Sequence, residues 1–134
     1  PTAGLDPSER NRFHNLLAEI GENIVVILST HIVDDVSDLC SSMAILGYGE
    51  ILLSVKPRAV IDSIKGSVWR KQVNRAEMSE LEQEYKVILS NLSEGETVIH
   101  VLSEERPEGF EVVDSDLEDV YFATLARNGI SVAL

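Results

Sequence analysis

The sequence has 134 residues, of which 11 are Lys or Arg and 23 are Asp or Glu, so its formal net charge is −12 and its pI is about 4.5. This balance argues against a nucleic-acid-binding protein, because neutralising phosphates requires clustered Lys and Arg side chains. With 44% hydrophobic and 25% charged residues, the composition excludes a fully disordered or low-complexity chain. The longest unbroken aliphatic run, residues 24–28, is far shorter than the roughly 20 residues of a membrane-spanning helix.

Acidic residues are concentrated in the second half of the chain. Residues 1–73 hold 7 basic and 9 acidic side chains, whereas residues 74–134 hold 4 basic and 14 acidic ones. We therefore predict two modules, an N-terminal one over residues 1–66 and an acidic α+β accessory domain over residues 67–134. The single cysteine, Cys40, cannot form an internal disulfide and fits a reducing cytoplasm.

The first predicted helix begins at Asp6, a favourable N-cap. Pro7 suits the first helical position, and Glu9, three residues after the cap, completes a capping box. Apolar residues at helical spacing share one face, which we expect to pack, and Gly21 ends the helix. The residues of this face are Phe13, Leu16, Leu17 and Ile20.

The rest of the first module alternates strands with short helices. The aliphatic run Ile24–Leu28 does not alternate with polar residues, which is typical of a strand covered on both faces in a parallel sheet. A helix is expected over residues 32–40, with Asp34 and Asp35 in its first turn. A hairpin over residues 43–55, turning at Gly47–Glu50, and a short helix over residues 57–65 follow.

The order of elements in the second module predicts a small α+β sandwich. We predict strands over residues 68–73, 86–92 and 97–102, a short strand near Val112, and a helix over residues 76–85. A closing helix is expected to be capped by Ser115 and Glu118 and to stop before Gly129. Its packed face holds Leu117, Val120, Tyr121 and Leu125.

Three segments together resemble the C-terminal part of an ABC transporter ATP-binding subunit. Ala3-Gly4-Leu5-Asp6, directly before the first helix, is similar to the family's D-loop, and Ser29-Thr30-His31, directly after the aliphatic strand, to its switch-histidine segment. The segment Leu117–Tyr121 resembles the end of many ATP-binding subunits of drug, antibiotic or sodium exporters. The resemblance covers the first 65 residues closely and the remainder more loosely.

The resemblance implies an α/β fold, namely the C-terminal part of a P-loop NTPase domain followed by a small α+β domain. It implies that His31 is catalytic and contacts the terminal phosphate of ATP, and that Ala3, Gly4, Leu5 and Asp6 lie at the interface of two ATP-binding subunits, a homodimer being expected. It also implies a membrane-spanning permease subunit as partner, and a location on the cytoplasmic face of the membrane. The activity implied is ATP hydrolysis coupled to export.

Other motifs of the family are missing from these 134 residues. The sequence contains no Gly-x-x-x-x-Gly-Lys-Ser/Thr, no glutamine loop and no signature of the Leu-Ser-Gly-Gly-Gln type, and it begins at Pro1, directly after the position of the family's Walker B acidic residues. We therefore expect the chain to be a fragment of a longer subunit that uses ATP and Mg²⁺, and to be inactive by itself.

Alternative interpretations remain for the chain and for single residues. A lone histidine such as His31 often only begins a helix, and Asp6 is an N-cap under either interpretation. The chain as a whole is alternatively a stand-alone interaction or ligand-sensing module. We predict no metal site. His14, expected on the exposed side of its helix, and His100, in an alternating strand, lack partner ligands, and Cys40 is expected to be buried and unreactive.

Two further groups receive structural interpretations. Trp69 and Val73 are interpreted as core residues on one strand face. The acidic run of Glu77, Glu80, Glu82 and Glu84 is interpreted as a solvated helix face.

Overall fold

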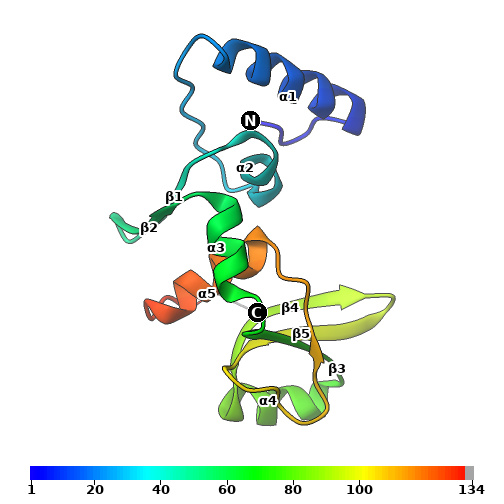
Figure 1. Cartoon of the computed structure of the whole chain (residues 1–134). Coiled ribbons are helices and arrows are strands. Elements are labelled where there is room, and N and C mark those ends of the chain that lie inside the picture. The colour runs from blue at the N-terminus through cyan, green and yellow to red at the C-terminus, as the bar shows by residue number, and fades with distance from the viewer. Residues whose placement is uncertain (132–134) are drawn as a thin grey trace.

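The computed structural model describes residues 1–131 as an elongated arrangement of helices and small antiparallel sheets (Figure 1). Helix α1 lies at one end, a four-stranded sheet lies at the other, and α3 and α5 lie between them. Within residues 1–131, no helix is long and apolar enough to cross a membrane. The elements are α1 (Pro7–Gly21), α2 (Val33–Leu39), β1 (Met43–Gly47), β2 (Glu50–Val55), α3 (Pro57–Ile64), β3 (Val68–Val73), α4 (Arg75–Glu84), β4 (Lys86–Ser93), β5 (Glu96–Leu102), β6 (Glu111–Val112) and α5 (Leu117–Arg127).

Most predicted elements are confirmed within one or two residues. The hairpin is formed by β1 and β2, which pair from Met43 with Val55 to Gly47 with Glu50. The second sheet has the strand order β4-β5-β3-β6, and its pairs are antiparallel. The family's phosphate-binding fold is not visible in these elements, which instead form a mixed α/β arrangement with antiparallel sheets.

One apolar core takes residues from both sides of residue 66. The helix α5 lies against α2, α3, β1, β2 and β4, so it contacts elements of the first module as well as the four-stranded sheet. Gly47 on β1 marks the closeness of this packing, because an added Cβ would come within 2.6 Å of Ile130 Cδ1 and 2.7 Å of Leu52 Cδ1. The buried residues of this core are Ile45, Val60, Ile64, Val68, Ile88, Leu89, Leu117, Val120 and Ala123.

A smaller core lies under the other face of the four-stranded sheet. Val73 and Phe110 are buried in it, and Trp69 packs against it while its indole N–H donates to the carbonyl of Ser103 at 3.0 Å. The interpretation of Trp69 and Val73 as core residues is confirmed. The acidic helix face is also solvated, since Glu80, Glu82 and Glu84 on α4 are exposed and Glu77 is half-buried.

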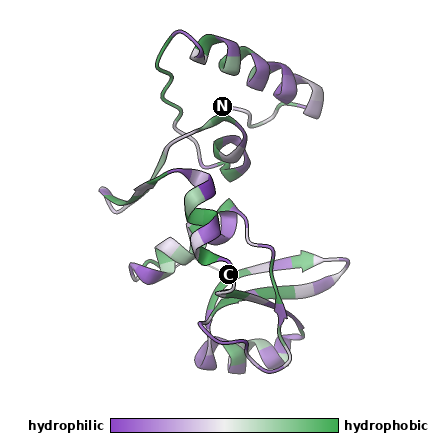
Figure 2. Ribbon diagram, in the orientation of Figure 1, coloured by the Kyte–Doolittle hydropathy of each residue, from purple (hydrophilic) through white to green (hydrophobic). Residues whose placement is uncertain are grey.

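The strand predicted over Ile24–Leu28 is not formed. This segment has no regular secondary structure, and no strand of residues 1–131 pairs with it, so its backbone lacks the ladder that defines a strand. Val25 and Ile27 are 88% and 91% exposed. Figure 2 shows this connection between α1 and α2 as a hydrophobic stretch of the ribbon.

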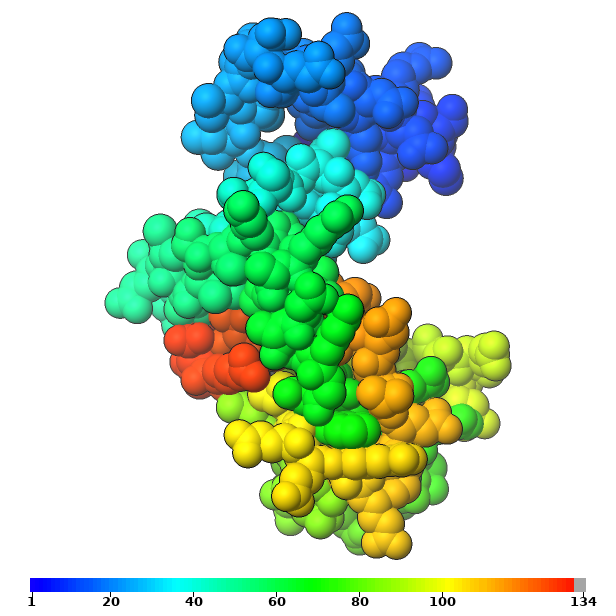
Figure 3. Space-filling view, viewed as in Figure 1, coloured from blue at the N-terminus to red at the C-terminus, as the bar shows by residue number. Residues whose placement is uncertain are grey.

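The packing predicted for the apolar face of α1 is also wrong in this structure. The helix has no buried residue, and Leu16 and Ile20 are exposed. The helical periodicity was correctly placed, but within residues 1–131 this face is covered only in part, since Phe13 and Leu17 are half-buried. In the space-filling view α1 and the connection after it form a lobe set apart from the rest of the molecule (Figure 3).

The cap of the closing helix is shifted by one residue from the prediction. Asp116, not Ser115, is the N-cap of α5: its carboxylate accepts from the Asp119 backbone N–H at 3.0 Å, and the Asp119 carboxylate accepts from the Asp116 N–H at 3.2 Å. Asp116 and Asp119 have the same i, i+3 spacing as Ser115 and Glu118, so the pattern alone did not separate the two pairs. Ser115 is instead buried, and among residues 1–131 its hydroxyl has no hydrogen-bond partner.

Candidate functional site

The residues before α1 form a tight turn that ends at a capped helix. The Leu5 backbone N–H donates to the Thr2 carbonyl at 3.2 Å, and Gly4, the third residue of this turn, has φ of 80°, which glycine adopts without strain. The Asp6 carboxylate accepts from the Glu9 N–H at 2.9 Å, and the Glu9 carboxylate accepts from the Asp6 N–H at 3.2 Å. The predicted capping box is therefore confirmed, and it holds the exposed residues Ala3–Asp6 at the start of a rigid helix.

His31 lies between the exposed aliphatic connection and α2. Its side chain is exposed, and the residue is followed by Ile32, the N-cap of α2, whose N–H donates to Thr30 Oγ1 at 3.0 Å. No side-chain hydrogen bond caps α2. His31 thus does not serve as the helix cap, and its imidazole is free of that structural role and accessible to a ligand.

A buried carboxylate that the sequence analysis did not single out connects these two segments. Asp35, on α2 one helical turn after His31, is fully buried (0% exposed). Its Oδ2 accepts from Thr2 Oγ1 at 2.6 Å, while its Oδ1 lies 3.0 Å from Arg10 Nη2, 3.3 Å from Arg10 Nε and 3.0 Å from His14 Nε2. We call Thr2, Arg10, His14 and Asp35 the Asp35 cluster.

The position of His14 corrects the prediction that it lies on the exposed side of α1. Its side chain is only 13% exposed and faces α2, where its Nδ1 is also 3.8 Å from Asp38 Oδ2. Arg10 and His14 are four residues apart and therefore share one face of α1. The spacing of Arg10 and His14 was the one sequence signal for their shared role, but it predicts a buried pair only when the facing Asp35 on α2 is known.

The environment of Asp35 favours its ionised form. Burial alone would raise the pKa of this carboxyl, but the hydrogen bonds from Thr2, His14 and Arg10 and the charge of Arg10 outweigh burial and lower it. The same carboxylate acts on Cys40 at the end of α2. Cys40 is half-buried, not buried as predicted. Burial, and then the negative charge of Asp35, raise the pKa of its thiol, which disfavours the reactive thiolate.

The lowered pKa of Asp35 predicts how the cluster depends on pH. A carboxyl whose folded-state pKa lies below its ordinary value of 3.8 stabilises the fold above that value, and the contribution is lost as pH falls through the folded-state pKa. We expect Asp35→Asn to lower the free energy of unfolding by about 1 to 3 kcal/mol at neutral pH. The difference from the wild type should shrink below about pH 4. Urea unfolding across this range measures it, and a constant difference would contradict the assignment.

A hollow of about 370 Å³ lies beside the unpaired aliphatic segment. Residues from α1, from the connection and from the end of α2 line it, among them Leu17, Ile24, Val26 and Cys40. Its lining is continuous with the exposed side chains of the connection. Ser41 and Ser42 also line the hollow, and His31 does not.

The histidine of the four-stranded sheet is paired as well. Nδ1 of His100 on β5 lies 2.6 Å from Oδ1 of Asp119, a buried residue of α5. Glu118 beside this pair is half-buried, and its pKa is raised by burial and by the carboxylates of Asp116, Asp119 and Asp34. The pairing of His100 was missed because His100 and Asp119 lie 19 residues apart in sequence.

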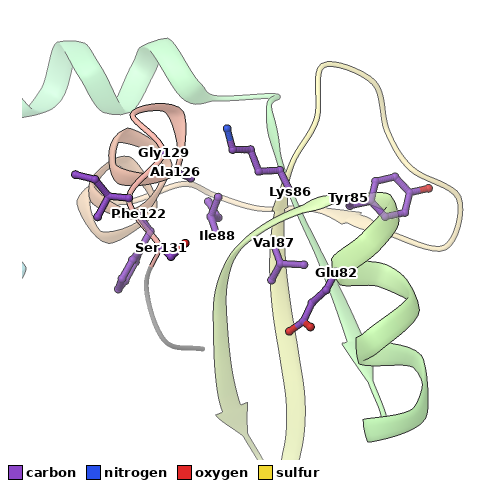
Figure 4. Close-up of a pocket in the computed structure, with 10 residues that line it drawn as sticks. Glu82, Tyr85, Lys86, Val87, Ile88, Phe122, Ala126, Gly129 and Ser131 are labelled. Carbon is purple, nitrogen blue, oxygen red and sulfur yellow. The ribbon is translucent and has the colours of Figure 1, made fainter.

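The second hollow, of about 350 Å³, lies between β4, the end of α4 and the end of α5 (Figure 4). The side chains of Glu82 and Lys86 point in opposite directions in this view, and Phe122 lines the hollow from α5. Polar groups that converge on one point are the usual mark of a specific small-molecule site. This hollow lacks that arrangement.

The described residues do not form a complete site for ATP and Mg²⁺. In the part of the chain that the structure describes, no group of three or more His, Cys, Asp or Glu side chains is placed to hold a metal ion. The sequence also lacks the glycine-rich loop and lysine that cradle phosphates. The exposed His31 carries an imidazole, which in its neutral form can donate from one nitrogen and accept at the other.

Comparison with known proteins finds relatives for part of the chain, although no protein-family model matches it. It is 37% identical over 65 residues to the energy-coupling factor transporter ATP-binding protein EcfA2 of Clostridioides difficile (strain 630), an alignment that covers 47% of this chain and 23% of the relative. It is 30% identical over 84 residues to the protein of the same name from Streptococcus pyogenes serotype M5 (strain Manfredo), covering 62% of this chain and 30% of the relative.

The chain thus matches less than a third of the length of these relatives. Their names describe ATP-binding proteins of energy-coupling factor transporters, and neither name describes an exporter. The similarity supports the interpretation of the chain as part of an ABC ATPase. It does not support the drug, antibiotic or sodium exporter type.

Proposed function

We propose that this chain works as part of an ABC transporter ATP-binding subunit, in which His31 contacts the terminal phosphate of bound ATP. The observation that carries the proposal is that the exposed His31 and the exposed turn Ala3–Asp6 are joined through the buried Asp35. The two segments on which the family resemblance depends therefore belong to one structural unit. The partial similarity to transporter ATP-binding proteins supports the same function.

In this proposal the chain supplies only part of the nucleotide site. Residues outside these 134 would hold the phosphates and Mg²⁺, since the chain contains no phosphate-binding lysine motif. One imidazole nitrogen of His31 would carry a proton and donate it in a hydrogen bond to the phosphate, while the other nitrogen accepts a hydrogen bond from a backbone N–H. Ala3, Gly4, Leu5 and Asp6 would face a second ATP-binding subunit.

The proposed partners follow from this role. They are a membrane-spanning subunit, which ATP hydrolysis would drive, and a second ATP-binding subunit, so that the complex would lie on the cytoplasmic face of the membrane. Because the relatives are named for energy-coupling factor transporters, the proposal covers the ATPase step and not export. The acidic residues 67–134 are proposed to form an accessory module of this subunit.

Calorimetric titration tests the proposal and separates it from a stand-alone module. We expect the 134-residue chain alone to show no magnesium-dependent affinity for ATP, because backbone N–H groups and a lysine make the main phosphate contacts. We expect a longer polypeptide, extended by the coding sequence upstream of Pro1, to bind ATP only with magnesium present. Micromolar binding by the chain alone would contradict the first expectation. Absence of binding by the longer polypeptide would overturn the proposed function and favour a non-catalytic interaction module.

A further inference from the structure

We infer that Asp35 and Thr2 are positioning residues, which hold the Ala3–Asp6 turn in a constant place relative to His31. The structural part of this inference stands on the Asp35 cluster alone, and its consequence for ATP turnover rests on the proposed function. Neither residue is one of those to which the resemblance assigns a role, namely Ala3–Asp6 and His31. Both act through other residues, because Asp35 is fully buried and Thr2 is 5% exposed.

The two oxygens of Asp35 serve different segments of the chain. Oδ2 accepts from Thr2 Oγ1 at 2.6 Å, across 33 residues of sequence, and fixes the residue that opens the turn. Oδ1 accepts from Arg10 and faces His14, and so fixes the helix that follows the turn. The turn is thereby held at both ends by one carboxylate.

The position of α1 depends strongly on polar contacts. The helix buries none of its residues fully, and only Phe13 and Leu17 of its apolar face are half-buried, so apolar packing contributes less here than it usually does to the position of a helix. The face toward α2 instead carries Arg10 and His14, whose side chains meet the fully buried carboxylate. A charge-assisted hydrogen bond to a buried carboxylate is stronger than a neutral one and has a defined geometry.

The helix α2 is itself held in place by the main apolar core. Val33 and Val36 of α2 pack against the main apolar core, and α2 lies directly against α5. His31 precedes α2 by one residue, and Asp35 lies within its first turns. A displacement of the turn relative to His31 therefore requires the Thr2–Asp35 hydrogen bond to break.

The experiment compares Thr2→Val, which keeps the shape of the side chain but removes its hydroxyl, with Thr2→Ser, which keeps the hydroxyl. Asp119→Asn is the matched control, since Asp119 is the other deeply buried carboxylate paired with a histidine, and its hydrogen bonds to His100 and Asp116 involve no member of the Asp35 cluster. The first measurement is amide hydrogen exchange of the 134-residue chain by NMR. Its reporters are the Leu5 and Glu9 N–H groups, both hydrogen-bonded within the turn and its cap.

We expect Thr2→Val to speed exchange at Leu5 on the order of tenfold or more, and Thr2→Ser to stay near the wild type. Asp119→Asn, which weakens the cap of α5 without displacing the helix, should speed exchange in the first turn of α5 but not at Leu5. The second measurement is steady-state turnover of the proposed subunit. There Thr2→Val should lower kcat on the order of tenfold with little change in KM for ATP, because misplacement of a positioned group costs rate rather than binding. Thr2→Ser should restore kcat, and Asp119→Asn should leave it unchanged.

Each result decides a separate question. Unchanged exchange at Leu5 in Thr2→Val overturns the positioning role, whatever the turnover. Thr2→Val could speed exchange at Leu5 while kcat stays normal, in a subunit whose turnover His31→Ala slows. That result overturns the consequence of positioning for catalysis. An equal loss of kcat in Asp119→Asn shows a general loss of stability and also overturns that consequence. A subunit whose turnover is insensitive to His31→Ala overturns the proposed function, while exchange at Leu5 still decides the structural part.

Discussion

Replacing His31 by Ala in the proposed ATP-binding subunit is expected to slow ATP turnover on the order of 100-fold. The melting temperature and the affinity for ATP should stay close to those of the wild type. The reason for the rate effect is that the substitution removes a preorganised interaction with charge that develops on the reacting phosphate. The reason for the small stability effect is structural: His31 is exposed, and α2 has Ile32 rather than His31 as its N-cap.

A purely structural role for His31 predicts the opposite pattern. Loss of a helix cap costs about 0.5 to 2 kcal/mol and would leave turnover nearly normal. His31→Asn is the informative second variant, because it stays polar but cannot carry a proton or reach as far. His100→Ala serves as a matched control, since it removes a histidine that pairs with the buried Asp119. It should lower stability without slowing turnover, and near-normal turnover in His31→Ala would rule out the phosphate contact.

Self-association of the 134-residue chain is the second large effect that we expect. The segment Ile24–Leu28 presents unpaired backbone and a run of exposed aliphatic side chains, with Val25 and Ile27 88% and 91% exposed. Unpaired strand-like backbone is a template for pairing with another chain, and burial of apolar surface contributes roughly 25 cal/mol for each Å² removed from water. Sedimentation velocity at increasing concentration should show a shift from monomer to dimer or larger species.

The responsible surface can be identified with charged substitutions. Val25→Lys combined with Ile27→Lys places two charges on one side of the segment and should return the chain to a monomer. Leu92→Lys is the control, because Leu92 is 79% exposed but lies on β4, far along the chain from this segment. A wild-type chain that stays monomeric at high concentration would count against the idea that Ile24–Leu28 normally lies between partner strands.

The elements that the sequence predicted well are those whose signals are local. The capping box of Asp6 and Glu9, the turn at Gly47–Glu50 and the start of α3 at Pro57 each depend on residues a few positions apart, and each is confirmed. The same local reasoning misplaced the cap of α5, because two pairs of residues with equal spacing competed and Ser115 is buried instead.

The predictions that are wrong concern what an element packs against. The aliphatic pattern of Ile24–Leu28 and the apolar face of α1 each indicate a buried environment, but within residues 1–131 both are covered only in part, and none of their side chains is fully buried. Periodicity describes which face is apolar and carries no information about the surface that covers it.

The Asp35 cluster was missed for a related reason. Asp35 was noted only as an acid in the first turn of a helix, and Thr2 was not singled out at all. Their hydrogen bond spans 33 residues, a distance over which a single sequence offers no pairing signal. The exposed positions of His31 and of Ala3–Asp6 agree with a role toward a ligand or a partner chain, but that role stays a prediction.

The contact of α5 with α2 makes the acidic C-terminal part mechanically continuous with the region around His31. Val33 and Val36 of α2 pack into the same core as Val120 of α5, and close-packed interiors transmit displacement instead of absorbing it. A protein or ligand that shifted α5 would therefore also move α2. Through Asp35, that movement would reach the Ala3–Asp6 turn before α1.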